Sequence, residues 1–131
     1  MKPPILFEHF QTGCVMGGIV QPCTSAMTRS LREIFGSRGS SDMAEGAAIG
    51  VAMMMRGYLG VVTPRPPGNV HVRQRFVLHA APCEAEPIRT VVTCLSKEIR
   101  RERRHVKLDV RGTGADGRAI YTGILNLIWA A

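Results

Sequence analysis

The order of the hydrophobic patterns constrains the fold of this chain more than any other feature. Residues 43–61 carry small or apolar side chains at nearly every position, including the consecutive methionines 53–55. A helix that is apolar nearly all round has to be buried on most sides, and consecutive strands with short turns usually pair as neighbours. The sequence therefore predicts an α+β fold in which an antiparallel sheet wraps around a long central helix. The strand patterns after the helix cover residues 69–80, 88–99, 103–111 and 118–129.

The predicted strands differ in how they are buried. Residues 104–111 alternate between apolar and polar side chains, which suits a strand with one dry face and one wet face. The last strand has apolar side chains at both its odd and its even positions, so we expect it to be buried on both faces. Before the helix, residues 6–10 and 14–20 are short strand-like pieces, and residues 24–35 have helical spacing between Thr24 as N-cap and Gly36 as stop.

Length and composition indicate a single globular domain over residues 1–131. The apolar fraction is 45%, with enough material for a hydrophobic core. The start of the chain has no uninterrupted apolar segment of the signal-peptide kind, and no stretch approaches the roughly 20 apolar residues that span a bilayer. We therefore expect a cytoplasmic protein without a membrane partner.

The cysteines lack any metal-binding or paired spacing. None forms a CxxC pair, and no histidine stands at zinc-finger spacing from them. In a cytoplasmic protein such thiols stay reduced. We expect all of them to be reduced and no metal to be bound. They are Cys14, Cys23, Cys83 and Cys94.

The net charge of +7 is concentrated in residues 97–107, where a hairpin connection is expected. Three interpretations remain open: a solvated hairpin tip, a site for an anionic ligand such as the phosphates of a coenzyme A thioester, and a nucleic-acid site. Nucleic-acid surfaces usually interleave aromatic side chains for stacking. No aromatic residue lies between Phe76 and Tyr121, so nucleic acid is the least favoured partner.

Two histidines of the first long strand stand at odd-numbered positions, as two of its arginines do. His71 and His79 lie an even number of positions along the chain from Arg73 and Arg75, which predicts one common face. That face is polar, so we expect these histidines to meet solvent.

Several segments, in their order and spacing, resemble hotdog-fold proteins of the MaoC-like dehydratase branch. The resemblance covers nearly the whole chain. It implies a hotdog fold, with an acyl thioester of coenzyme A or acyl carrier protein as substrate or ligand, and no other cofactor. The matching segments are residues 6–13 (LFEHFQTG), 24–36, 46–50 (GAAIG), 69–76 and 118–123 (RAIYTG).

The chain departs from this family where the hydratases carry their reactive groups. They have an Asp-x-Asn-Pro-x-His segment before the central helix, because hydrating an enoyl thioester takes a base and an acid. Residues 37–46 (SRGSSDMAEG) hold an Asp and a Glu but no Asn-Pro and no His, and Ile49 stands where the family often has a second His. An enoyl hydratase or dehydratase, a thioesterase and a non-catalytic acyl-binding or regulatory protein all remain possible.

Two carboxylates at the start of the helix are the candidate catalytic groups. Asp42 and Glu45 could simply cap the helix and meet its dipole. By resemblance to hotdog thioesterases and dehydratases, one of them acts as base, while free N–H groups of the helix polarise the thioester carbonyl. The residues expected to bind substrate are Arg38, Gly46, Ala47 and Gly50.

The apolar helix and last strand also bear on assembly. A single copy of a sheet wrapped around a helix would leave apolar surface uncovered, which monomeric proteins rarely tolerate. We therefore expect a homodimer or a dimer of dimers.

Overall fold

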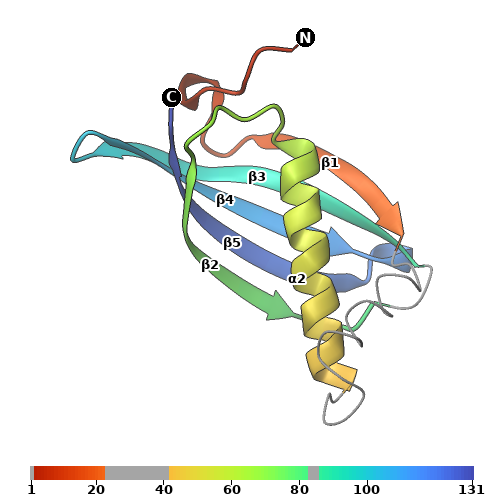
Figure 1. The fold of residues 1–131 in the computed structure, drawn as a ribbon. Helices are drawn as coiled ribbons and strands as arrows, with labels where there is room; N and C mark the ends of the chain where they lie inside the picture. The colour runs from red at the N-terminus through yellow and green to blue at the C-terminus, as the bar shows by residue number, and fades with distance from the viewer. Residues whose placement is uncertain (1, 23–41, 83–85) are drawn as a thin grey trace.

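A five-stranded antiparallel sheet with one long helix across one face forms the fold, as Figure 1 shows for this computed structural model. The structure describes residues 2–22, 42–82 and 86–131, and the side chains of residues 42–46 are outside that description. The predicted α+β class, with a sheet wrapped around a central helix, is confirmed. In chain order the elements are η1 (Phe7–His9), β1 (Val15–Pro22), α2 (Asp42–Val61), β2 (Val70–Leu78), β3 (Pro87–Arg100), β4 (Arg103–Thr113), η2 (Ala115–Gly117) and β5 (Ala119–Trp129).

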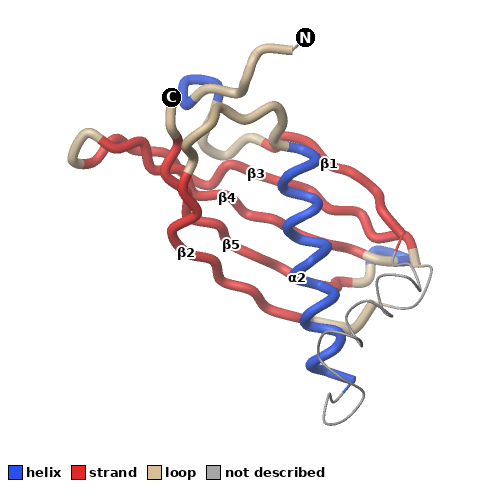
Figure 2. Tube along the Cα trace, viewed as in Figure 1, coloured by secondary structure: helices blue, strands red, loops and turns tan. Residues whose placement is uncertain are grey.

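The predicted helix and the four long strands appear within two residues of their expected bounds (Figure 2). The first strand-like piece is different, because residues 7–9 form a 3-10 turn. His9 Nδ1 accepts a hydrogen bond of 2.9 Å from the Leu6 amide, which favours a tight turn over an extended chain. The helix expected over residues 24–35 lies outside the described residues. No helix in the described ranges is long and apolar enough to cross a membrane.

The strand order is β1-β3-β4-β5-β2. Consecutive strands pair from β3 to β5 as predicted, but β2 pairs with β5 and not with β3. The connection from β2 to β3, residues 79–86, is too long for a tight hairpin. Neighbouring strands lie about 5 Å apart, so this segment can cross two intervening strands at the end of the sheet.

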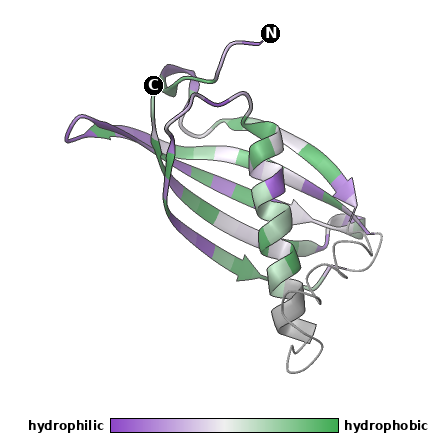
Figure 3. Ribbon diagram, in the orientation of Figure 1, coloured by the Kyte–Doolittle hydropathy of each residue, from purple (hydrophilic) through white to green (hydrophobic). Residues whose placement is uncertain are grey.

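Glycines and a row of apolar side chains hold α2 close to the sheet. A Cβ on Gly57 would run into the Thr90 side chain, and the Met54 sulfur, Sδ, lies where a Cβ on Gly123 would be. Figure 3 shows apolar colour along α2 and the strands beneath it, and hydrophilic colour at the tip of the β3–β4 hairpin. The largest fully buried side chains are Trp129, Tyr121, Phe10, Met53, Met54, Ile88, Leu108, Ile120 and Leu125.

Burial of α2 and β5 is more one-sided than their sequences predict. Helix α2 buries Ile49, Met53 and Tyr58 against the sheet, whereas Arg56 and Leu59 on its other side are exposed. The prediction that β5 is buried on both faces is wrong for the single protomer. Its side chains toward the helix are buried, and those on the outer face are half-buried, because none of the elements in the described residues forms a second layer over that face. The half-buried residues are Thr122, Ile124, Asn126 and Ile128.

Candidate functional site

The start of α2 carries most of the residues predicted to act on a substrate. Asp42, Glu45 and Gly46 lie in its first turns, but their side chains are outside the described part of the chain. Arg38 lies outside the described residues altogether. Asp42 is the first residue of the helix and Glu45 follows three positions later. Their roles stay predictions.

The next turns of α2 pack against the end of β2. Ala47 is half-buried and Gly50 is buried. A Cβ on Gly50 would lie 2.7 Å from Phe76 Cζ, so the glycine lets the helix approach the ring. Phe76 in turn stacks on Tyr121 of β5, with ring centroids 5.8 Å apart. The sheet side of Gly50 is thus filled by an aromatic ring, and its contact with a substrate stays a prediction.

A buried pair of hydroxyls lies under the middle of α2. Thr90 Oγ1 and Tyr121 Oη share a hydrogen bond in the core. Burial raises the pKa of Tyr121, and the hydrogen bond to Thr90 offsets part of that rise. Burial likewise raises the pKa of Tyr58, with a smaller opposite effect from nearby Arg65. Both phenols are therefore neutral near pH 7 and suit hydrogen bonding better than proton abstraction.

The Cys94 thiol is not set up as a nucleophile. Cys14 and Cys94 are both free, and burial raises the pKa of Cys94 more than nearby Lys97 lowers it. A reactive cysteine needs a lowered pKa. Across the residues whose placement is described, no three His, Cys, Asp or Glu side chains gather as metal ligands. Cys23 and Cys83 lie outside those residues, so the expectation of reduced thiols and no metal stays a prediction.

The two histidines of the first long strand do not share a face, which corrects the sequence prediction. His71 pairs with Leu127, on the helix side, whereas Arg73 pairs with Asn126, on the outer side. A register shift between His71 and Arg73 reverses the parity. His79 follows β2, where its Nε2 lies 3.1 Å from the Thr122 hydroxyl on the outer side.

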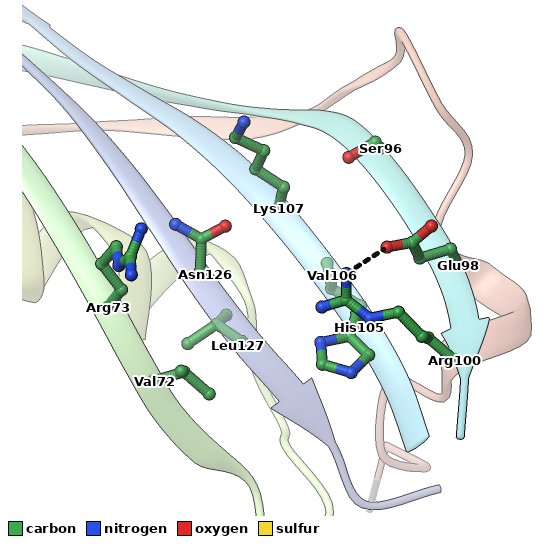
Figure 4. A pocket seen from close by; sticks show the side chains of 10 residues that line it. All are labelled: Val72, Arg73, Ser96, Glu98, Arg100, His105, Val106, Lys107, Asn126 and Leu127. Carbon is green, nitrogen blue, oxygen red and sulfur yellow. Dashed lines mark ion pairs between the residues drawn. The ribbon is translucent and has the colours of Figure 1, made fainter. Parts of the chain in front are cut away.

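A groove of about 370 Å³ crosses the outer face of the sheet near the β3–β4 hairpin. Its floor is a row of four residues in register on neighbouring strands. Arg73 pairs with Asn126, Asn126 with Lys107, and Lys107 with Ser96. Figure 4 shows these side chains together with Arg100, His105 and the apolar Val72, Val106 and Leu127.

Positive charge dominates this groove. Arg100 is paired with Glu98 at 3.6 Å, the single carboxylate among the lining residues. A neighbouring hollow at the hairpin tip shares Arg100 and His105 and adds Arg101 and Arg103. The basic run was visible in the sequence, but Arg73 was not linked to it. That link depends on the pairing of β2 with β5, which no local pattern reveals.

Neither protein-family models nor curated proteins give a match to the sequence. Solved structures do match in fold. A MaoC-like dehydratase from Rhodospirillum rubrum has a TM-score of 0.78 at 11% identity, with 95% of this chain and 96% of that chain covered. An unliganded R-hydratase from Pseudomonas aeruginosa has a TM-score of 0.76 at 12% identity, with 96% and 86% covered.

A third match is a 3R-hydroxyacyl-ACP dehydratase complex from Mycobacterium tuberculosis. Its TM-score is 0.70 at 15% identity, with 89% of this chain and 96% of that chain covered. The likeness runs over nearly the full length in each case, and at these identities it concerns the fold. The chain has the hotdog fold, in the form that MaoC-like dehydratases share.

Proposed function

We propose that this protein binds an acyl thioester of coenzyme A or acyl carrier protein beside the start of α2. The observation that carries the proposal is the full-length likeness in fold to MaoC-like dehydratases and an R-hydratase. In this proposal the helix N–H groups near Gly46 hold the thioester carbonyl, because the first turn of a helix has unpaired donors. Arg38, Ala47 and Gly50 complete the binding surface.

The proposed reaction is hydration or dehydration of the acyl chain, or hydrolysis of the thioester. Asp42 or Glu45 takes the role of base in either reaction. A carboxylate works best as a base near neutral pH when its surroundings raise its pKa, and partial burial has that effect. With no histidine in residues 37–46 to share the work, slow turnover is expected.

The second candidate is a non-catalytic acyl-binding or regulatory protein. The absence of an Asn-Pro-x-His sequence from residues 37–46 favours it, because the acid partner of the hydration is then missing. Both candidates use the same ligand and the same end of α2. They differ only in turnover.

We further propose that two copies assemble through β2 and work in the cytoplasm. Strand β2 is an edge of the sheet, and its side chains are largely exposed, including Val70, Val72 and Val77. An unpaired edge of this length is open to pairing with a second strand. Two-fold pairing of β2 with its copy would join the two sheets into one.

Turnover assays on a panel of acyl thioesters distinguish the two candidates. Hydration of crotonyl-coenzyme A is followed by loss of the enoyl absorbance, and hydrolysis by release of the free thiol. Binding is measured in parallel by calorimetry with the same thioesters. Binding with turnover supports the enzyme, binding without turnover supports the acyl-binding protein, and no binding contradicts both.

Asp42→Asn and Glu45→Gln test the assignment of the base. Each keeps the size of the side chain and removes its charge. General bases usually contribute at least about a hundredfold to rate, so one of the two variants should lose that much turnover. If turnover is robust and neither change lowers it by more than about tenfold, the base lies elsewhere.

A further inference from the structure

We propose that the groove on the outer face of the sheet binds a small ligand that carries two or more phosphate groups, of the size of a nucleoside diphosphate. The groove lies on the side of the sheet away from α2, because its floor residue Asn126 alternates with Leu125 and Leu127, which are buried toward the helix. It is therefore a second site. The proposal does not rest on the thioester proposal.

The cations of the groove converge from different parts of the chain. Arg73 on β2 and Lys107 on β4 flank Asn126 on β5, so two strand spacings of about 5 Å each separate their Cα atoms. Long side chains on either side of that gap can both reach an anion above Asn126, whose amide offers a further donor. Two cations at this separation match a diphosphate better than a single phosphate.

Two irregularities of the sheet direct side chains into this groove. A register shift between His71 and Arg73 turns Arg73 to the outer face, and another between Cys94 and Ser96 does the same for Ser96. Bulges interrupt pairing, and they often re-aim a side chain at a functional site. Both lie at residues that line or border the same groove.

The hairpin tip adds cations in an unfavourable backbone conformation. Arg101 and Glu102 form the turn between β3 and β4 with φ of 52° and 66°. A two-residue turn of this kind favours Asn-Gly, because other residues pay a steric cost in the left-handed region. Arg101 lines the hollow that adjoins the groove. The conformation places an arginine where stability alone would favour a smaller residue.

The charge of the groove is poorly neutralised by the protein itself. Within the described ranges, the side chains of Arg73, Arg101, Arg103 and Lys107 form no hydrogen bond or ion pair. Elsewhere on the same face, Arg111 is held by Asp109 at 2.9 Å. Unpaired cations beside the exposed Val72, with Ser96 and Asn126 as neutral donors, suit a ligand with several phosphates and a less polar remainder.

The size and lining of the groove favour a small ligand over nucleic acid. A volume of about 370 Å³ falls within the range of small-molecule pockets. No Phe, Tyr or Trp lines the groove or the tip hollow, and the imidazole of His105 is the one ring among the lining residues, so a run of stacked bases has little platform there.

Calorimetric titration of the full chain with inorganic pyrophosphate and with ADP at low ionic strength tests this site. Both ligands should bind, and binding should weaken as salt is added. Arg73→Gln and Lys107→Gln should each weaken binding by about tenfold, as expected for a lost charge-assisted hydrogen bond. The matched control is Arg89→Gln, an exposed outer-face arginine at the far end of β3, which should change affinity less than about twofold.

Three outcomes would overturn the proposal. The first is no binding of pyrophosphate or ADP at low salt by wild-type protein. The second is an equal loss of affinity in Arg89→Gln and in the groove variants, which would mean that only net charge matters. The third is a single-stranded oligonucleotide that binds far more tightly than ADP and depends on Arg73 and Lys107, which would assign the groove to nucleic acid. Melting curves that match wild type show that the variants are folded.

Discussion

Single glycines decide how closely the helix can lie on the sheet. Gly57 faces Thr90, and a Cβ there would lie 2.9 Å from the Thr90 Cβ and closer still to its methyl group. Thr90 is buried, β-branched and held by its bond to Tyr121, so it cannot move aside. Gly60 is exposed, and its added Cβ would meet only the end of the Ile19 side chain at 3.2 Å.

These two glycines give a matched pair of substitutions in one helix. Gly57→Ala should lower the free energy of unfolding by about 1–3 kcal/mol, because overpacking outweighs the gain in helix propensity. Gly60→Ala should raise it by up to about 1 kcal/mol, since the helix gains propensity without a rigid clash. Urea unfolding of both variants measures the difference. Equal effects of the same sign would contradict the close contact at Gly57.

The buried tyrosines predict how stability changes in alkali. The pKa values of Tyr58 and Tyr121 are raised above the ordinary value of 10.0 by burial in the folded protein. As pH rises past about 10, the unfolded chain ionises first, so the free energy of unfolding falls until the folded pKa is passed. Urea unfolding from pH 7 to pH 11 should show this fall.

The double variant Tyr58→Phe, Tyr121→Phe should flatten the alkaline part of that profile, since the chain then has no tyrosine left. At neutral pH it should be less stable by about 1–3 kcal/mol, because the Thr90 hydroxyl loses its buried partner. An unchanged alkaline slope would show that other groups cause the loss.

At the scale of elements, the sequence predicts what depends on local periodicity. The apolar run of α2 and the alternation in β4 identify a helix and a strand without knowledge of their neighbours. The pairing of β2 with β5 is different, because it depends on where the chain goes after residue 79. The faces of His71 and Arg73 follow from that pairing and its register shift. The simple alternation of side chains along a strand therefore assigned His71 to the outer face, whereas it lies on the helix side.

The dependence on strand pairing also limits what the sequence predicts about the candidate site. Asp42 and Glu45 could be assigned to the start of the central helix because the helix pattern begins there. The outer-face groove could not be predicted, because Arg73, Asn126 and Lys107 are brought into one row only by three neighbouring strands. The sequence shows which segment carries the positive charge, and the strand order determines which other side chains lie beside that segment.

The β3–β4 hairpin offers an element-scale test of stability against ligand binding. Replacing Arg101-Glu102 by Asn-Gly should stabilise the protein by about 1–2 kcal/mol, since both residues have positive φ. The same change removes a cation from the tip hollow, so pyrophosphate affinity should fall. Thermal unfolding and calorimetry measure the two effects. A less stable variant would contradict the strained turn.

For the whole molecule, the open edge of β2 predicts assembly. Light scattering at micromolar concentration should give the mass of a dimer or a tetramer, as the exposed Leu59 and Val77 also favour. Amide exchange in β2 should then be as slow as in β4, because pairing with a copy protects the free side of the strand. A monomer mass, with fast exchange along β2, would contradict assembly through this edge.

Hydrogen–deuterium exchange with and without a bound acyl thioester tests the central proposal most directly. The proposed acyl site predicts slower exchange in peptides that cover residues 42–50 of α2 when crotonyl- or butyryl-coenzyme A is added. The β3–β4 hairpin on the other face serves as the internal comparison, and pyrophosphate added beforehand removes any effect of the thioester phosphates there. Slower exchange confined to the hairpin, or no change anywhere at saturating thioester, would contradict an acyl site at the start of the helix.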